Sequence, residues 1–542
     1  MNFNRTLRFA SRLSPCAHWS FSASLSIGLL LSSPFAFGRD WYVQSGAPAG
    51  AGTERSPFNS LAAAQSMSAI GDTIFVVAAP PSTPALGGGI VLKDRQKLVG
   101  KGEDITRKGF DSTSDRAKIT HSLGDAVTLA NDNEVKNLQI DDPLGGGIMA
   151  VNKTGGKLSK LLLTRSSDRS AQLYDQSLCA LVTNPSQTAV DYTSSKLVGC
   201  GDSPQFFRPS PAISLVERKS AINLLAESVD GDYKLDDISI EDVPLAQFRL
   251  WRAGLMLRSA GKAELKAGVN GLSSNRSLRG IMVRAYYQGK VELKMKDVSV
   301  QDTLNDGLGV FVGFMCDGLP PTFDLGGFTC QQAFGAPVPL SRAEIVVNLD
   351  GYRYRGFQRF GNENNANGIE VGALGGLGTS RIEFHMQDSE ITHSAAAGLD
   401  LEQVLGYLSP DSIIDLGCVT NDCKQRGYTS KGNNKIYDNG VNAFTGIFGS
   451  AAGRQAQLGN MQVQLLLNGG NNNASSNIVY AQNNFWGANP ASPITCYSLD
   501  WPIRAGALFP TANCIFSIDA FSVTPSYFDA RFPILSIDSK GH

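Results

Sequence analysis

A repeat of short strands that each open with a glycine constrains the fold of this chain more than any other feature. GLMLR, GIMVR, GLGVFV, GIEVG and GLDLE begin at Gly254, Gly280, Gly307, Gly368 and Gly398. Their spacings are 26, 27, 61 and 30 residues, and the longest contains an insertion with Cys316 and Cys330. Repetition at this period is typical of solenoids, so it outweighs the several domains that 542 residues would otherwise suggest.

Two further strands follow each glycine strand. The second is AELK, VELK, AEIV or IEFH, and the third follows an acidic turn residue in KLDDISIED, KMKDVSVQD and HMQDSEITH. The turn residues are Asp237, Asp297 and Asp388, with Asp350 and Asn137 as further members. The strands alternate with period two, and no helix-length segment interrupts them. Such short strands pair with their equivalents one repeat later, which predicts an all-β parallel β-helix with coils of about 26 residues.

Stacking the coils turns equivalent positions into columns. The predicted interior columns are Leu255, Ile281, Leu308, Ile369 and Leu399, then Leu257, Val283, Val310, Val371 and Leu401. The outward columns of the glycine strands are Met256, Met282, Gly309, Glu370 and Asp400, then Arg258, Arg284, Phe311, Gly372 and Glu402. On the second strand, we expect an outward column of Glu264, Glu292, Glu344 and Glu383, compensated at its start by Lys266 and Lys294.

The start of the chain predicts a cap for the first coil. Residues 58–69 have the pattern of a short amphipathic helix, ended by Gly71 and Asp72 before the strand TIFVV. DWYV, SPFNSL, GDTIFV and LVGKG (residues 40–103) resemble the secreted right-handed parallel β-helix proteins of the pectate-lyase-like superfamily. NIVYAQNNFWGANPASP (477–493) resembles their Asn-rich terminal coil. The resemblance implies a right-handed single-stranded β-helix with an N-terminal capping helix, but no particular activity, because the superfamily holds lyases, hydrolases, epimerases and non-enzymes.

The first residues have the pattern of a secretory signal peptide. Arg5, Arg8 and Arg12 precede the apolar run 21–31, and small residues favour cleavage after Gly38. That run is too short to cross a bilayer. We therefore expect a secreted or periplasmic protein that is not inserted in a membrane. Its expected parts are the signal peptide (1–38), the cap and first coils (39–130), the β-helix (131–493) and a C-terminal cap or tail (494–542).

Eight cysteines remain after signal cleavage, and an even count in an exported chain predicts disulfides. A zinc site would need clustered Cys or His spacing, which the sequence lacks. The cysteines fall into local couples, expected as Cys179–Cys200, Cys316–Cys330, Cys418–Cys423 and Cys496–Cys514. Cleavage removes three arginines and no acid, so 45 basic and 49 acidic residues remain, a net charge of −4 that gives no support for nucleic-acid binding.

Charged residues in line on the outer face of the glycine strands predict a site for an acidic sugar. Carboxylates can hold Ca²⁺, and arginine can clamp a uronate carboxylate in a bidentate pair. The candidate catalytic residues are Arg284, Arg355, Glu370, Asp400 and Glu402. The candidate substrate-binding residues are Arg258, Phe311 and Arg359, and calcium, the one candidate cofactor, would bind Glu370 and Asp400. The alternative is an ordinary charged surface.

The segment GYRYRGFQRFGNENNANG (351–368) is the densest basic and aromatic stretch. A one-residue slip relative to the other turns would bury Tyr352 and Tyr354 and expose Arg353 and Arg355. Arg355 and Arg359 would then lie beside the acidic face. The spacing of His385 and His393 fits neither a helical metal pair nor a known triad, and we expect His385 to point outward.

These patterns predict an exported protein that binds an acidic polysaccharide and, as an enzyme, would cleave or epimerise it as a lyase, an epimerase or a glycoside hydrolase. A lyase would use Arg or Lys to take the C5 proton while Ca²⁺ or Arg neutralises the uronate. The WxDH and RxPxxR motifs of pectate lyases, the polygalacturonase set and the DPHD of alginate epimerases are absent. The alternative is a non-enzymatic surface or matrix protein that binds a glycan or a partner.

Overall fold

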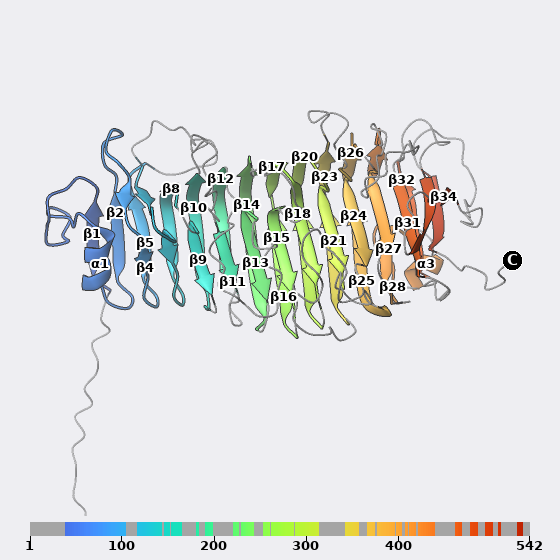
Figure 1. Ribbon diagram of the computed structural model, residues 1–542, viewed down its shortest axis with the longest axis horizontal. Helices are drawn as coiled ribbons and strands as arrows, with labels where there is room; N and C mark the ends of the chain where they lie inside the picture. Colours follow the sequence, from blue (N-terminus) through green and yellow to red (C-terminus); the bar gives the residue numbers. More distant parts are fainter. Residues whose placement is uncertain are drawn as a thin grey trace, which may run out of the picture. The chain divides into compact units, whose positions relative to one another are not determined.

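The chain divides into two units, Met1–Phe37 and Gly38–His542, and the computed structural model describes parts of the second (Figure 1). The described residues are 38–103, 116–143, 146–151, 153–164, 180–183, 190–198, 220–226, 229–242, 253–260, 262–286, 288–313, 342–356, 366–373, 377–395, 397–403, 407–409, 411–418, 421–425, 427–439, 461–468, 477–485, 494–501, 508–510 and 528–534. Several predicted features lie outside them: the signal peptide up to Phe37, Arg359, Cys179, Cys200, Cys316, Cys330 and Cys514.

The glycine strands form one sheet of 13 strands, called here the glycine-strand sheet. All its neighbours pair in parallel except the last two, which are antiparallel. In stacking order the strands are β4 (Ile90–Val91), β7 (Val127–Thr128), β9 (Ile148–Val151), β11 (Ala180–Thr183), β13 (Ile222–Ala226), β15 (Ala253–Ser259), β18 (Arg279–Ala285), β21 (Leu308–Val312), β24 (Ile369–Ala373), β27 (Leu399–Gln403), β31 (Met461–Asn468), β33 (Ile494–Trp501) and β34 (Leu508–Pro510).

The second and third strands of the coils form a sheet of 22 strands, called here the corner sheet. Its strands are β1 (Asp40–Gln44), β2 (Thr73–Val77), β3 (Leu86–Gly87), β5 (Lys97–Lys101), β6 (Lys118–Thr120), β8 (Glu134–Asp141), β10 (Gly156–Thr164), β12 (Val190–Val198), β14 (Gly231–Glu241), β16 (Glu264–Asn270), β17 (Ser273–Ser277), β19 (Lys290–Lys296), β20 (Ser299–Thr303), β22 (Glu344–Asp350), β23 (Arg353–Arg355), β25 (Leu377–Gln387), β26 (Glu390–Thr392), β28 (Tyr407–Leu408), β29 (Ile413–Gly417), β30 (Lys435–Tyr437), β32 (Asn477–Asn484) and β35 (Phe528–Ile534).

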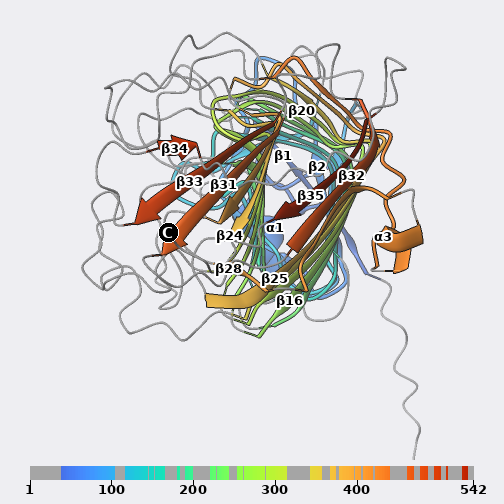
Figure 2. The ribbon, with the colours of Figure 1, turned by 90° about the vertical axis from the view of Figure 1, so that its right-hand side faces the viewer.

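The pairing confirms the predicted parallel β-helix. Leu255 pairs with Ile281, which pairs with Leu308, and both predicted interior columns are buried throughout. Strands of successive coils lie side by side in Figure 1 and one behind another in Figure 2. Each coil thus buries its inward residues against those of its neighbours, which a single coil could not do alone.

The corner between the second and third strands is a left-handed residue. Asn137, Asp237, Asp297 and Asp388 have φ of 54°, 56°, 52° and 50°, as expected for Asn and Asp in such turns. Asp350 does not belong to this set, contrary to our expectation. It is a strand residue paired with Lys296, and Gly351 (φ 75°) makes the turn.

This displacement confirms the one-residue slip predicted for the GYRYRG segment. Tyr352 and Tyr354 are buried, and Arg353 and Arg355 are exposed. The Tyr352 hydroxyl donates to the Gly368 carbonyl at 3.2 Å, and the Tyr354 hydroxyl lies 3.0 Å from the Thr303 hydroxyl. Hydrogen bonds of this kind offset the cost of burying the two phenols.

The predicted capping helix is α1 (Leu61–Met67), which buries Leu61 and Ala64. The Ser60 side chain caps it by accepting from the Ala63 N–H at 3.3 Å. Asp72 ties the cap to the first strand, because its carboxylate accepts from Trp41 Nε1 at 2.8 Å and from the Ala69 N–H at 2.7 Å. The apolar end of the first coil is thereby covered.

At the other end of the stack, parallel pairing continues past residue 493, where we expected the tail to begin, because β33 pairs in parallel with β31. Both sheets then finish with an antiparallel strand. β34 pairs with β33, and β35 pairs with β32. An antiparallel strand occupies hydrogen-bonding groups that the last coil would otherwise expose.

Candidate functional site

The outer face of the glycine-strand sheet brings most of the predicted site residues together. Met256, Met282, Gly309, Glu370 and Asp400 pair in one column, as predicted. The second column, Arg258, Arg284, Phe311, Gly372 and Glu402, also has the predicted register. The side chain of Glu402 is not among those described.

This face is not the exposed surface that we expected. Arg258 is 0% exposed, Arg284 1%, Asp400 2% and Glu370 8%. Strand alternation predicts which side of a sheet a residue occupies, but it carries no information about what lies over that side. The expectation of an exposed outer face along the glycine strands is therefore wrong for the residues that the structure describes.

Part of the face is apolar packing. Ala253, Met256, Met282 and Phe311 form one buried cluster, and the Arg284 guanidinium lies 5.2 Å from the Phe311 ring centroid. A Cβ placed on Gly309 would come within 2.8 Å of that ring. Gly309 thus makes room for Phe311 to pack.

The acidic part of the face is a buried network of carboxylates. Arg279 Nε lies 2.9 Å from Asp306 Oδ2, and the Asn367 amide donates to Asp306 and to Asp400, both at 3.4 Å. Burial, followed by the neighbouring Glu370 carboxyl, raises the pKa of Asp306 well above its usual range. The positive partner of this network is an arginine.

Calcium binding by Glu370 and Asp400 was the metal expectation. Over the described residues, no group of three or more His, Cys, Asp or Glu side chains is placed to hold a metal ion. The Asn367 amide donates an N–H to Asp400 at 3.4 Å. Calcium binding by Glu370 and Asp400 stays a prediction.

Arg355 lies apart from this network. It is exposed on β23 of the corner sheet, paired with Gln301 and Thr392, whereas Glu370 and Asp400 lie on the glycine-strand sheet. Arg355 and the acidic residues thus lie on different sheets, because the third strand of each coil belongs to the corner sheet.

The second strands carry alternating charges instead of the expected glutamate column. Glu264 pairs with Lys290, which pairs with Glu344, which pairs with Arg381. Lys290 Nζ lies 3.2 Å from Glu264 Oε1, and Arg381 Nη1 lies 2.7 Å from Glu344 Oε1. The true register differs from the predicted one by two residues. A two-residue shift keeps every side chain on the same face of the sheet. The prediction of which residues point inward and which point outward is therefore correct despite the register error.

An open groove of about 480 Å³ crosses the outer face of the corner sheet. Its two central columns run across β14, β16, β19, β22 and β25. They are Lys234, Gly268, Lys294, Asn348 and His385, and beside them Asp236, Asn270, Lys296, Asp350 and Gln387. A Cβ on Gly268 would meet nothing within 4 Å, so the floor is open at that coil.

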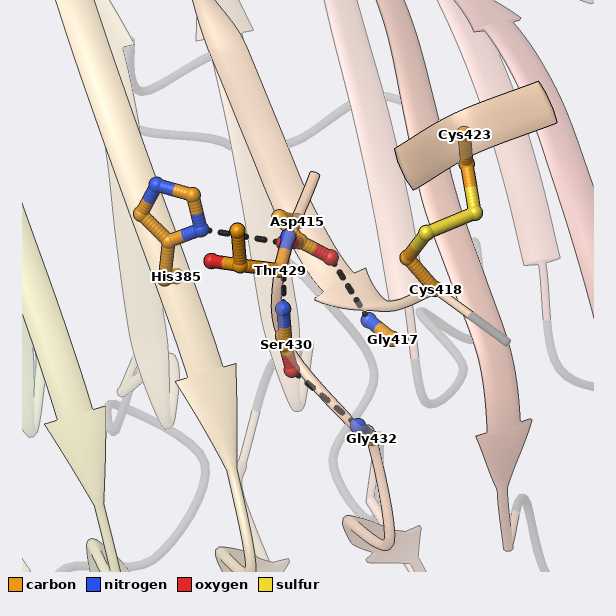
Figure 3. The surroundings of a disulfide bond; sticks show 8 residues. All are labelled: His385, Asp415, Gly417, Cys418, Cys423, Thr429, Ser430 and Gly432. Atoms are coloured by element: carbon orange, nitrogen blue, oxygen red, sulfur yellow. Dashed lines mark hydrogen bonds and ion pairs between the residues drawn. A yellow bond between two sulfur atoms is a disulfide. The ribbon is translucent and has the colours of Figure 1, made fainter. Parts of the chain in front are cut away.

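At one end of the groove, His385 lies between two carboxylates. Its Nδ1 is 3.0 Å from Asp415 Oδ2, and its Nε2 is 3.0 Å from Glu383 Oε1. Asp415 is fully buried and also accepts the backbone N–H groups of Gly417 (3.1 Å), Thr429 (2.6 Å) and Ser430 (2.7 Å). Figure 3 shows this carboxylate among its donors. His385 therefore points outward as predicted, and it contacts Asp415, a residue that no sequence pattern singled out.

The two carboxylates set the charge of the ring. Burial alone would lower the pKa of His385, but hydrogen bonds to Asp415 and Glu383 outweigh it and raise that pKa above its ordinary value. Burial likewise acts to raise the pKa of Glu383, and hydrogen bonds from His385 and Arg381 reverse the sign and lower it. The structure thus favours an imidazolium facing the ionised carboxylate of Glu383.

A disulfide fixes the loop that completes this end of the groove. Cys418 follows Gly417 directly and is bonded to Cys423 in α3 (Asn421–Gln425), with the Cα atoms 5.8 Å apart (Figure 3). The predicted Cys418–Cys423 pair is therefore confirmed. Cys496 lies on β33, where side chains are not described. The short α3 loop leads back to Thr429 and Ser430, which line the groove and donate to Asp415.

Comparison with known proteins adds little to this description. No family model and no curated protein matches the chain. Among solved structures, it matches DFA-IIIase from Arthrobacter chlorophenolicus A6, without its lid and in complex with GF2. That match has a TM-score of 0.28 and 11% identity, over 67% of this chain and 91% of the other. The fold assignment therefore rests on the strand pairing above.

Proposed function

We propose that this is an exported parallel β-helix protein that binds an acidic polysaccharide in the groove of the corner sheet. The observation that carries the proposal is the lining of that groove: lysines and asparagines recur across the coils of an open sheet face, with a histidine at one end. Equivalent positions of adjacent coils are separated by about 4.8 Å, so the polar groups form a periodic track suited to an extended polymer.

The sign of the charge favours an anionic chain. Lys294 and Lys296 both project from β19 and are exposed, about 7 Å apart along the strand. Asp236 and Asp350 also line the groove, but Lys234 Nζ lies 2.8 Å from Asp236 Oδ2 and offsets it. Ammonium groups make charge-assisted hydrogen bonds to carboxylates or sulfates, and amides such as Asn348 can bind hydroxyls.

Export is supported by the signal-peptide pattern at the N-terminus and by the disulfide at Cys418. Within the described part of the chain, no helix is long and apolar enough to cross a membrane. A non-enzymatic surface or matrix protein would use the same groove.

Calorimetry with polygalacturonate, alginate and a neutral glucan tests the proposal. We expect the acidic polymers to bind and the neutral one not to bind. Replacing Lys294 and Lys296 by Gln should weaken binding about tenfold for each lysine, the scale of one charge-assisted hydrogen bond. Lys266→Gln is the matched control, because Lys266 lies on the same sheet, pairs with Glu264 at 3.2 Å and is outside the groove. Equal losses in the control would contradict the proposed site.

A further inference from the structure

Two arginines on a third strand are both exposed and project from the same face. Arg353 and Arg355 flank the buried Tyr354 on β23. Residues i and i+2 of a strand point to the same side, so the two side chains leave the backbone about 7 Å apart. Neither guanidinium forms a hydrogen bond or an ion pair with a side chain in the described part of the chain. We call these two residues the arginine pair.

Comparable arginines on the corner sheet are neutralised. Arg276, also on a third strand, β17, donates from Nη2 to Asp242 Oδ2 at 2.8 Å and from Nε to the other carboxylate oxygen. Arg381 Nη1 lies 2.7 Å from Glu344 Oε1. Like charges at neighbouring outward positions of a sheet repel. An anion bound to the arginine pair would supply the counter-charge that Asp242 and Glu344 supply elsewhere.

The side chains beside the arginine pair are mostly neutral. In register with it are Ser299 and Gln301 of β20 on one side, and Glu390 and Thr392 of β26 on the other. Glu390 is the one acid of these four, and its Oε1 accepts from the Tyr437 hydroxyl at 2.8 Å. Hydroxyl and amide groups such as those of Ser299 and Gln301 can bind the hydroxyl groups of a sugar.

The wider face around the arginine pair is positive. The charged outward residues of β23, β26 and β30 are three cations and one acid, a net charge of +2: Arg353, Arg355, Lys435 and Glu390. An acid on the adjacent β20, Asp302, lies at a left-handed corner (φ 52°) and interacts with Arg276 of the preceding coil. The net charge of this face thus favours an anionic ligand.

Buried tyrosines fix the backbone beneath the arginine pair. The Tyr352 N–H donates to Ser389 Oγ at 3.1 Å, and the Tyr352 hydroxyl donates to the Gly368 carbonyl at 3.2 Å. The Tyr354 hydroxyl lies 3.0 Å from the Thr303 hydroxyl. Because the strand is held from the interior, only the two arginine side chains lose freedom when an anion binds.

The arginine pair lies around one corner from the groove. Asp350 lines the groove, Gly351 makes the turn, and Arg353 follows two residues later. Three residues of chain span at most about 10 Å. Lys296 of the groove pairs with Asp350 in register, so cations lie on both sides of this corner. A polymer bound at Lys296 can therefore reach the arginine pair by crossing the corner.

We infer that the arginine pair is a second subsite for the acidic polysaccharide, in which the two guanidiniums bind a carboxylate of the chain that lies in the groove. The inference rests on the binding proposed above. Guanidinium groups bind carboxylates in bidentate pairs, which adds geometric selection to the attraction between the charges. Two anchored acidic groups, one on each side of the corner, favour a polymer with closely spaced carboxylates over one with isolated charges.

Calorimetry with polygalacturonate and alginate on the full mature chain tests the subsite. Arg353→Gln and Arg355→Gln should each weaken binding about tenfold, the scale of one charge-assisted hydrogen bond, and the double variant should weaken it further. Arg276→Gln is the matched control, because it removes the same charge from a third strand, but Asp242 already neutralises that charge. The control should change the Kd by no more than about twofold. Circular dichroism checks that each variant folds.

The outcomes separate the subsite from the groove. Unchanged binding by the double arginine variant, or an equal loss in Arg276→Gln, would overturn the subsite. If Lys294→Gln and Lys296→Gln still weaken binding in that case, the groove remains the binding site. A wild type that binds neither polygalacturonate nor alginate would refute the proposed function itself.

Discussion

Side chains alternate between the two faces on both sheets, but the outer face of the corner sheet is open and that of the glycine-strand sheet is buried. On the corner sheet, most outward residues of β16, β19, β22 and β25 are polar or charged, they pair across coils, and some of them line an open groove. On the glycine-strand sheet, the outward residues of β15, β18 and β21 are 0–2% exposed, and they include two arginines. The pleat decides which side a residue takes, and the remaining structure decides whether that side is a surface or an interior.

The chemistry of the two faces differs accordingly. Charges on the corner sheet remain hydrated and contribute little individually to stability. Buried charges on the glycine-strand sheet must be paired, and Arg279 with Asp306 is such a pair.

Truncating an outward methionine of the glycine-strand sheet should be as costly as truncating a core residue. Met282 is fully buried, so Met282→Ala should lower the free energy of unfolding by about 2–5 kcal/mol, measured by urea denaturation. Glu292 on the corner sheet is also an outward residue, but it is partly exposed. Glu292→Ala should cost no more than about 1 kcal/mol. Similar costs for both variants would mean that the two faces are not different environments.

The pH dependence of stability should have opposite signs on the two faces. The raised pKa of Asp306 gives stability that is complete below the unfolded value of about 3.9 and is lost as pH rises toward the folded value. In the wild type, the free energy of unfolding should therefore fall by up to about 1.4 kcal/mol per pH unit above the unfolded pKa. Asp306→Asn should reduce this fall. The lowered pKa of Glu383 gives stability that is present above about 4.3 and is lost as pH falls.

Glu383→Gln should thus reduce stability at neutral pH and leave it unchanged in strong acid, the reverse of Asp306→Asn. Denaturation midpoints of both variants and the wild type between about pH 3 and 8 make the comparison, since that range spans the ordinary values of both acids. If the two variants change the pH dependence in the same direction, the assignment of a proton-retaining acid to one face and an ionised acid to the other is wrong.

The sequence contained enough to predict the coils but not their surroundings. Glycine spacing and period-two alternation were sufficient for the interior columns of Leu255 and Ile281. Burial of Arg258 could not be predicted, because an arginine at an outward position is ordinarily solvated. His385 and Asp415 are 30 residues apart and meet only because β25 stacks on β29. The sequence signal for that meeting is two polar residues at equivalent outward positions of successive coils.

The register error on the second strands is itself testable. Similar letters suggested that Glu264 stands over Glu292, whereas the first glycine spacing of 26 residues places it over Lys290, as the structure does. Lys290→Glu would set three carboxylates in a row with Glu264 and Glu344, and it should cost about 1 kcal/mol in low salt and less in high salt.

The swapped pair Glu264→Lys with Lys290→Glu provides the rescue, because it restores opposite charges between these two coils. Its coupling energy, measured by urea denaturation of the two single variants and the double variant, should be favourable by a few tenths of a kcal/mol or more. In the register suggested by the letters, Lys290 would not face Glu264, and the two changes would simply add. Strict additivity at low salt would therefore support the register with a glutamate column and contradict the alternating charges on the second strands.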